Sequence, residues 1–91
     1  MIDDATIPTL AEGVSFREVG QQAILLRLTD GQLYSLNETG SSFVSKIDGS
    51  RGFGTIVSML EEEYEIEPAV LRADIEELIA ALKKDGLLIE R

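Results

Sequence analysis

The spacing of apolar residues changes at Asn37, and this change restricts the fold more than any other feature of the sequence. Before Asn37, Val14–Val19 alternates between apolar and polar residues and Ala23–Leu28 is densely apolar, two patterns that are typical of strands. After Asn37, apolar residues recur every three or four positions, as they do on one face of a helix. Because 91 residues make one domain, the sequence predicts a single α+β domain over residues 1–91, in which a sheet precedes helices.

Three antiparallel strands are predicted in the first half of the chain. Asp30-Gly31 separates two strand-like runs and is typical of a type I′ hairpin turn, in which both central residues need positive φ. Gly20-Gln21 is a second turn candidate, since glycine accepts positive φ. Residues 1–12, with Pro8 and several acidic residues, are expected to be a loosely held lead-in. The predicted strands are Val14–Val19, Ala23–Leu28 and Gln32–Leu36.

Three helices are predicted in the second half. Asn37 is a good N-cap for the first helix, and Gly49 and Gly86 are typical C-terminal stops. The last helix has the clearest period, with apolar residues at i, i+4, i+7, i+8 and i+11 counted from Leu71. The apolar tail Leu87-Leu88-Ile89 must also pack somewhere. The predicted helices are Glu38–Ile47, Thr55–Tyr64 and Pro68–Asp85, an order that resembles a winged helix-turn-helix with its strands placed first.

The chain contains no Cys and no His. Thiol nucleophiles, imidazole bases, His-assisted triads, disulfides and Cys/His zinc sites are therefore excluded. A domain this small also buries only ~60–65% of the surface that its unfolded chain exposes, which leaves little volume for a closed active site. We expect a protein that is not an enzyme and has no catalytic residues, no metal site and no cofactor.

The net charge of −9 comes from 8 basic and 17 acidic residues. Nucleic acids and anionic membranes are poor partners for such a chain, because both require positive charge on the protein. Met1–Leu10 has neither the basic flank nor the apolar run of a signal peptide, and no apolar run approaches the ~20 residues that span a bilayer. We expect a soluble, cytoplasmic protein.

A motif at the junction of the two halves resembles the PqqD family: Gly31-Gln-Leu-Tyr34-Ser-Leu36-Asn37-Glu-Thr39-Gly40. The family often carries a Trp in its first helix, which this chain lacks, and Phe43 can fill that volume. The resemblance covers roughly residues 8 to 90. It continues at Pro8, Gly13-Val14, Phe43-Val44, Asp48-Gly49, Leu60…Tyr64 and Asp74-Ile75…Leu82…Gly86-Leu87-Leu88.

The resemblance implies a recognition element for ribosomally made, post-translationally modified peptides (RiPPs). Such a domain binds the leader of a precursor peptide and presents it to a modifying enzyme, often a radical SAM enzyme. In the namesake pathway the product is pyrroloquinoline quinone, and similar proteins serve lasso-peptide and other RiPP pathways. Two other hypotheses stay open: a winged-helix transcription factor, which the acidic last helix disfavours, and a homodimer formed through the exposed strand edge.

The predicted peptide site lies along the last strand of the sheet. The outer edge of that strand offers unpaired N–H and C=O groups, to which a peptide can add as a further strand. The last helix is expected to form the opposite wall, which either Leu33 and Ser35 or Tyr34 and Leu36 face. The predicted peptide-binding residues are Gln32, Leu33, Tyr34, Ser35, Leu36, Arg72, Ile75, Glu76 and Ile79.

Most of these residues also have a structural interpretation. Leu36 and Ile75 suit the hydrophobic core, and Tyr34 suits a packed aromatic with its hydroxyl in water. Arg72 has Glu76 at i+4 as an intrahelical partner. The run Glu61-Glu62-Glu63 is either a solvated face or a docking surface for a basic partner.

Overall fold

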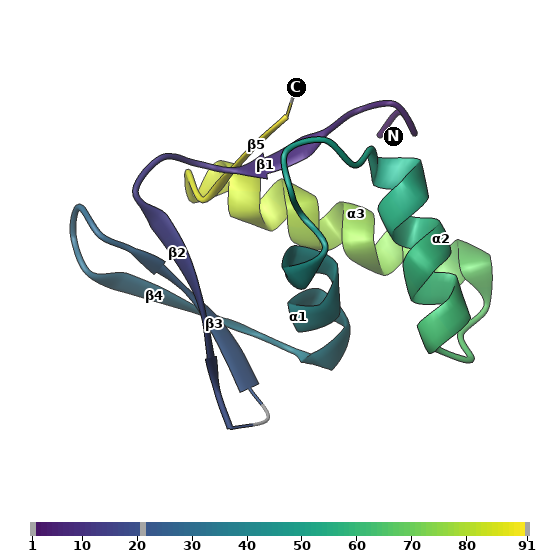
Figure 1. Ribbon diagram of the computed structural model, residues 1–91, viewed down its shortest axis with the longest axis horizontal. Helices are drawn as coiled ribbons and strands as arrows, with labels where there is room; N and C mark the ends of the chain where they lie inside the picture. The colour runs from purple at the N-terminus through teal and green to yellow at the C-terminus, as the bar shows by residue number, and fades with distance from the viewer. Residues whose placement is uncertain (1, 21, 91) are drawn as a thin grey trace.

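A three-stranded sheet packs through one face against a group of three helices in this computed structural model, which describes residues 2–20 and 22–90 (Figure 1). Helix α1 contacts β3 and β4, and α2 packs against α1 and α3. No helix in the described part of the chain is long and apolar enough to span a bilayer. The elements are β1 (Pro8–Leu10), β2 (Val14–Val19), β3 (Gln22–Arg27), β4 (Gln32–Leu36), α1 (Glu38–Ser45), α2 (Phe53–Glu63), α3 (Pro68–Lys84) and β5 (Leu88–Glu90).

The sheet has the order β2-β3-β4, with both pairs antiparallel. Phe16, Leu25 and Tyr34 are directly opposite one another across the three strands. Since side chains alternate along each strand, these three lie on the face that packs against the helices. The prediction of an α+β fold with a three-stranded antiparallel sheet followed by three helices is confirmed.

The loop between β3 and β4 differs from the predicted two-residue turn. The last strand pair is Arg27 with Gln32, so residues 28–31 form a four-residue loop. Gly31 has φ of 73°, and no non-glycine residue in the described ranges has positive φ. The type I′ prediction is therefore wrong, because Asp30 would need positive φ as well. Gln21, in the other predicted turn, lies outside the described residues.

A side chain supports this loop in place of the tight turn. Arg27 donates from Nε and Nη2 to the two carboxylate oxygens of Asp30 at 3.1 and 2.9 Å. The backbone N–H of Gln32 also donates to Asp30, at 3.1 Å. These hydrogen bonds lower the pKa of Asp30 below its ordinary value, and the one from Arg27 has the largest effect. The hairpin is thus closed by an ion pair rather than by backbone conformation alone.

The N-terminal segment is tied to the helices, in contrast to the expected loose lead-in. Strand β1 pairs with β5, with Pro8 opposite Glu90 and Leu10 opposite Leu88. Helix α2 begins after Gly52, which has no side chain to cap it. Instead the N–H groups of its first two residues, Phe53 and Gly54, donate to backbone carbonyls at positions 6 and 4 at 2.7 and 3.0 Å. The lead-in is therefore held at two places, by strand pairing with the apolar C-terminal tail and by its hydrogen bonds to the start of α2.

The helix boundaries follow from their caps. The side chain of Asn37 accepts a hydrogen bond from the N–H of Gly40 at 2.7 Å, so the predicted cap of α1 is confirmed. Helix α2 starts at Phe53, two residues before the predicted Thr55, because the lead-in satisfies its first N–H groups. The helical core is built from fully buried apolar side chains, among them Phe43, Phe53, Ile56, Leu60, Leu71 and Leu82.

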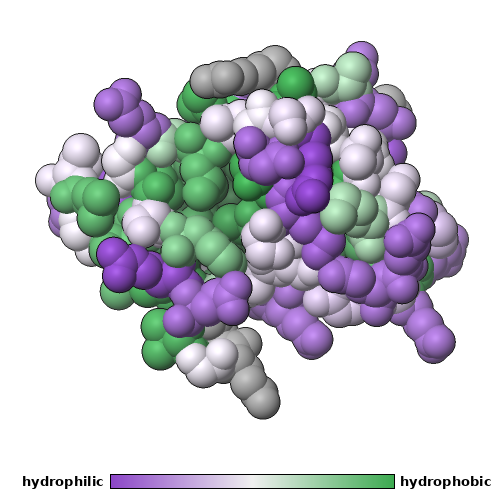
Figure 2. Space-filling model, in the orientation of Figure 1, coloured by the Kyte–Doolittle hydropathy of each residue, from purple (hydrophilic) through white to green (hydrophobic). Residues whose placement is uncertain are grey.

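The surface differs between the two halves of the molecule. In Figure 2 apolar side chains gather over the half that contains the sheet, and hydrophilic side chains dominate over the helices. Three large apolar residues of the sheet region, Val19, Leu28 and Leu33, are 60–66% exposed. The outer face of the sheet is therefore left open by the helices.

Candidate functional site

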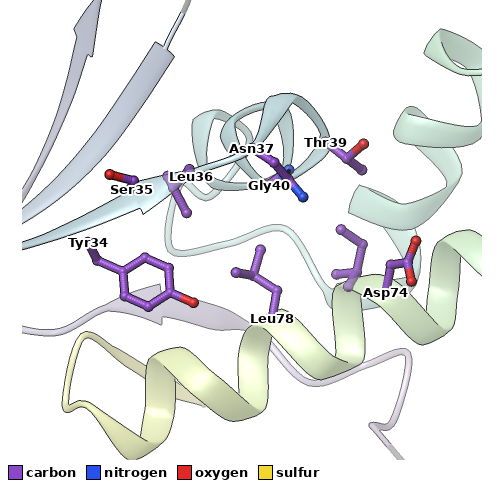
Figure 3. Close-up of a pocket in the computed structure, with 9 residues that line it drawn as sticks. Tyr34, Ser35, Leu36, Asn37, Thr39, Gly40, Asp74 and Leu78 are labelled. Carbon is purple, nitrogen blue, oxygen red and sulfur yellow. Dashed lines mark hydrogen bonds between the residues drawn. The ribbon is translucent and has the colours of Figure 1, made fainter.

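A groove runs between β4 and α3 (Figure 3). Its deeper part is a cavity of about 240 Å³, and a shallower part of about 380 Å³ continues along α3 toward Ala81. The first is smaller than the ~300–1,000 Å³ pockets that enclose small molecules and is suited to one or two side chains. The groove is lined by Tyr34, Ser35, Leu36, Asn37, Thr39, Gly40, Asp74, Ile75, Glu77, Leu78 and Ala81.

The sequence of α3 determines which residues form one wall. Asp74, Glu77, Leu78 and Ala81 are spaced i, i+3, i+4 and i+7, so they share one helical face. Leu78 also belongs to the apolar stripe that starts at Leu71, and the other members of that stripe are buried in the core. The groove wall is thus the border between the buried stripe of α3 and its solvated side.

The other wall is β4, and its orientation decides between the two predicted alternatives. Figure 3 shows the Tyr34 ring and Leu36 pointing toward α3, whereas Ser35 points away. Leu36 is buried and Tyr34 is partly buried, while Leu33 is 60% exposed. The side chains of Tyr34 and Leu36 therefore face the helix, whereas the side chains of Leu33 and Ser35 lie on the outer face of the sheet.

The floor of the cavity is apolar and its rim is polar. Leu36 and Ile75 are buried below it and Leu78 is partly buried beside it. Gly40 lets α1 lie close to α3, because a Cβ at that position would lie 3.0 Å from Oδ1 of Asn37 and 3.2 Å from Cδ2 of Leu78. Asn37, which caps α1, completes the rim, so the groove can take an apolar side chain with polar groups around it.

The backbone of β3 shows which groups of β4 are free. The carbonyl of Arg27 accepts a hydrogen bond from the N–H of Gly31 at 2.8 Å, so the backbone groups of Arg27 face β4. The N–H of the next residue, Leu28, donates at 2.8 Å to the carbonyl of Gly13, on the opposite side, as alternation along a strand requires. By the same alternation, Leu25 directs its backbone groups to β4.

Two residues of β4 therefore present their N–H and C=O groups to the groove. Tyr34, opposite Leu25, is bonded to β3. Leu33 and Ser35, on either side of it, direct theirs to the open edge. In residues 2–20 and 22–90, β4 pairs with no strand except β3, so these groups have no partner strand. The edge can accept one more strand beside the cavity.

The two walls carry different charge. β4 has no charged residue between Gln32 and Leu36. On α3, Asp74 and Glu77 are both exposed, and no hydrogen bond or ion pair joins either carboxylate to another described residue. Within the described ranges, no group of three or more acidic side chains is arranged to hold a metal ion. The groove is acidic along one side only.

Arg72 and Glu76, which were predicted for this wall, lie on another side of α3. Arg72 forms an ion pair with Asp4, and its guanidinium lies over the ring of Phe53, 4.9 Å from the centroid. The hydrogen bond with Asp4 raises the pKa of Arg72 above its ordinary value. Glu76 accepts a hydrogen bond at 2.9 Å from the N–H of Ile2. These two residues hold the N-terminal segment, and the partner of Arg72 is Asp4 rather than Glu76.

The remaining predicted residues also divide into those that line the groove and those that lie elsewhere. Tyr34, Ser35, Leu36 and Ile75 line the groove, and Leu33 lies at its edge through its backbone. Gln32 is bonded to Arg27 at the far end of β4, and Ile79 is 1% exposed, in the core. The residues missed by sequence reasoning are Asn37, Thr39, Gly40, Asp74, Glu77, Leu78 and Ala81, of which those on α3 share a helical period that the sequence already shows.

Comparisons with known proteins agree with the predicted fold. The family profile described as "Coenzyme PQQ synthesis protein D (PqqD)" matches residues 22–88. The structure of TbiB1 in complex with the TbiA(beta) leader peptide superposes with a TM-score of 0.79 at 22% identity, covering 88% of this chain and 93% of that chain. A lasso peptide synthetase B1 complexed with the leader peptide gives 0.80 at 24% identity, covering 91% and 98%. The comparison with curated protein sequences gave no match.

These matches extend over both the sheet and the helices. They do not confirm the likeness to winged helix-turn-helix proteins, which stays a prediction. At these identities the solved structures establish the fold, whereas the profile, which matches most of the chain, establishes the family.

Proposed function

The chain belongs to the PqqD family, and from this premise we propose that it is a non-catalytic adaptor for a ribosomally made precursor peptide. The leader of that peptide binds in the groove between β4 and α3, and the adaptor presents it to a modifying enzyme in the cytoplasm. A radical SAM enzyme is the partner that the family implies. Pyrroloquinoline quinone biosynthesis and a lasso-peptide or other RiPP pathway are the two settings that fit.

The observation that carries this proposal is the free backbone edge at Leu33 and Ser35 beside a cavity with an apolar floor and a polar rim. A peptide strand opposite these residues gains main-chain hydrogen bonds. Its alternate side chains, opposite Tyr34 and Leu36, then enter the groove, because those two residues face α3. Backbone pairing supplies affinity and the cavity supplies selectivity. That both similar solved structures are complexes with leader peptides supports this reading.

The direct test is an amide NMR titration of the labelled chain with leader segments of short precursor-like peptides encoded beside its gene. We expect shifts at Leu33 and Ser35 and along residues 74–81 that saturate at micromolar peptide or below. Saturating shifts confined to other residues would contradict the groove and leave peptide binding intact. No response to any of the leaders would contradict the adaptor function itself.

A proline variant tests the edge without disturbing the sheet. Ser35→Pro removes an N–H that points away from β3, and proline is tolerated at such edge positions. We expect the variant to fold and to lose most peptide affinity, since one main-chain hydrogen bond is lost and the proline ring blocks close approach. Glu18→Pro is the matched control, because Glu18 lies on β2 with its N–H at the other open edge. Equal loss of affinity in both variants would contradict the assignment to β4.

A further inference from the structure

Within residues 2–20 and 22–90, no ion pair involves Asp74 or Glu77, the two carboxylates of the groove. Arg27, Lys46, Arg51, Arg72 and Lys83 each pair with a carboxylate elsewhere in the fold. None of these five cations lines the groove. Asp74 and Glu77 therefore differ from the carboxylates of these ion pairs, each of which has a cationic side chain beside it.

Asp74 and Glu77 are one helical turn apart and line the same groove. Like charges at this spacing on a helix destabilise it by a few tenths of a kcal/mol. The facing wall, Gln32–Leu36, is neutral, so it neither repels nor compensates them. A cation placed between the walls would be attracted by both carboxylates, and this attraction is screened by salt because both side chains are exposed. The groove is thus complementary to positive charge at its rim and to an apolar group at its floor.

The geometry of strand addition relates the acidic rim of the groove to its apolar floor. Side chains of an added strand that enter the groove are two residues apart. The deeper part of the groove is lined by Leu36, Ile75 and Asp74, and the shallower part by Asp74, Glu77 and Ala81, while Tyr34 and Leu78 line both. Both parts have an apolar contact and a carboxylate within the same lining.

We propose that the segment bound here carries a Lys or Arg two residues from an apolar anchor, and that Asp74 and Glu77 select for this basic side chain. The inference rests on the proposed function, because it describes the peptide that the adaptor accepts. It adds a charge requirement to the bound segment, set by residues of α3 that do not belong to the core. Acidic peptides with the same apolar residue are rejected by the same two carboxylates.

A displayed library of random ten-residue peptides, sorted on the immobilised chain, tests this without knowledge of the natural leader. We expect the recovered binders to show Lys or Arg, and to lack Asp and Glu, at the position two residues from an apolar one. The double variant Asp74→Asn/Glu77→Gln should lose this preference. Glu62→Gln/Glu65→Gln, which removes two exposed carboxylates outside the groove, is the control of equal net charge and should retain it.

One recovered peptide is then measured in solution. For its Lys form, we expect the groove variant to raise Kd about three- to tenfold at low salt, and the control variant to leave it unchanged. With norleucine in place of that Lys, the wild type and the groove variant should bind equally. Amide shifts at Leu33 and Ser35 show whether the peptide occupies the groove.

The outcomes separate this inference from the proposed function. If no recovered peptide shifts the β4 amides, strand addition is contradicted, and the charge preference with it. If peptides occupy the groove without a basic preference, or the preference survives equally in the groove variant and the control, the charge inference is overturned and the adaptor function stands. Loss of the preference in the groove variant alone supports both.

Discussion

The sheet and the helices of this chain have opposite surfaces. Residues 14–36 contain two acidic and two basic residues, whereas residues 37–91 contain twelve acidic and six basic ones. The sheet region leaves Val19, Leu28 and Leu33 largely exposed, while the exposed faces of α2 and α3 are rich in Glu and Asp (Figure 2). The groove lies where these two surfaces meet, so it combines a neutral strand edge with an acidic helix wall.

The two regions are also held in different ways. The helices enclose the core, the Lys46–Glu63 ion pair joins the end of α1 to α2, and the N-terminal segment caps α2. The sheet is a single layer with one face covered, and in the described part of the chain neither of its edges, β2 or β4, pairs with a further strand. A rigid helical body beside an open sheet edge is the arrangement that strand addition needs, because the body positions the wall while the edge stays available. The following predictions test this contrast, from the largest expected effect to the smallest.

Phe53→Ala should give the largest loss of stability. The side chain is fully buried at the start of α2, and truncation of a buried Phe costs about 3–5 kcal/mol through lost burial and the cavity left behind. Urea unfolding followed by circular dichroism measures the change. A loss below about 1 kcal/mol would show that the helical core does not dominate stability.

Deletion of residues 1–6 should cost less, about 1–3 kcal/mol, because two N–H groups of α2 lose their acceptors. Asp4→Asn is the matched control. It keeps the backbone carbonyl of residue 4 and weakens only the ion pair with Arg72, so we expect less than about 1 kcal/mol. Equal losses in the deletion and in Asp4→Asn would show that the ion pair, not the backbone cap, is what the N-terminal segment contributes.

Acid should destabilise the helical half more than the sheet. The pKa of Glu63 is lowered by Lys46 and then Ser42, and that of Asp30 by Arg27 and then the Gln32 backbone. Both carboxyls bind fewer protons in the fold than in the unfolded chain, so their stabilisation is present above their ordinary pKa values of 4.5 and 3.8 and is lost as the pH falls below them.

The two carboxyls are distinguished by the distance along the chain to their partners. Glu63 joins α2 to α1, whereas Asp30 and Arg27 are three residues apart and stay close in the unfolded chain. In urea unfolding at pH 6, 4 and 3, Glu63→Gln should therefore flatten the pH dependence more than Asp30→Asn. The reverse order would contradict the view that ion pairs hold the helices more than the sheet.

Leu33→Ser should have the smallest effect on stability, within about 0.5 kcal/mol, because this side chain is 60% exposed on the outer face of the sheet. Peptide binding through its backbone should also persist. A loss above about 1 kcal/mol would show that this face is covered, for instance by a second copy of the chain, and sedimentation at several concentrations would then reveal it.

Much of the fold was predictable because it depends on patterns of residues that lie close together in the sequence. The alternation in β2 and β4, the Asn37 cap and the apolar stripe of α3 each depend on residues a few positions apart. The groove was predictable to the same extent: β4 and Ile75 were identified, since an edge strand and a helix face are both visible as patterns. The acidic wall of α3 was missed because solvated acidic residues are common on helices and no local signal shows which of them face a strand.

By itself, the sequence determined the order of a three-stranded sheet and three helices, the alternation of side chains along the strands, and the exclusion of thiol and imidazole chemistry. Only the tertiary structure decided the pairing of β1 with β5, the backbone cap of α2, and the division of α3 between groove and N-terminal segment. The physical reason is the separation in sequence between the residues that interact. Strands of three residues are too short to show a period, and the partner of a side chain such as Arg72, which lies 68 positions from Asp4, depends on packing that no local pattern records.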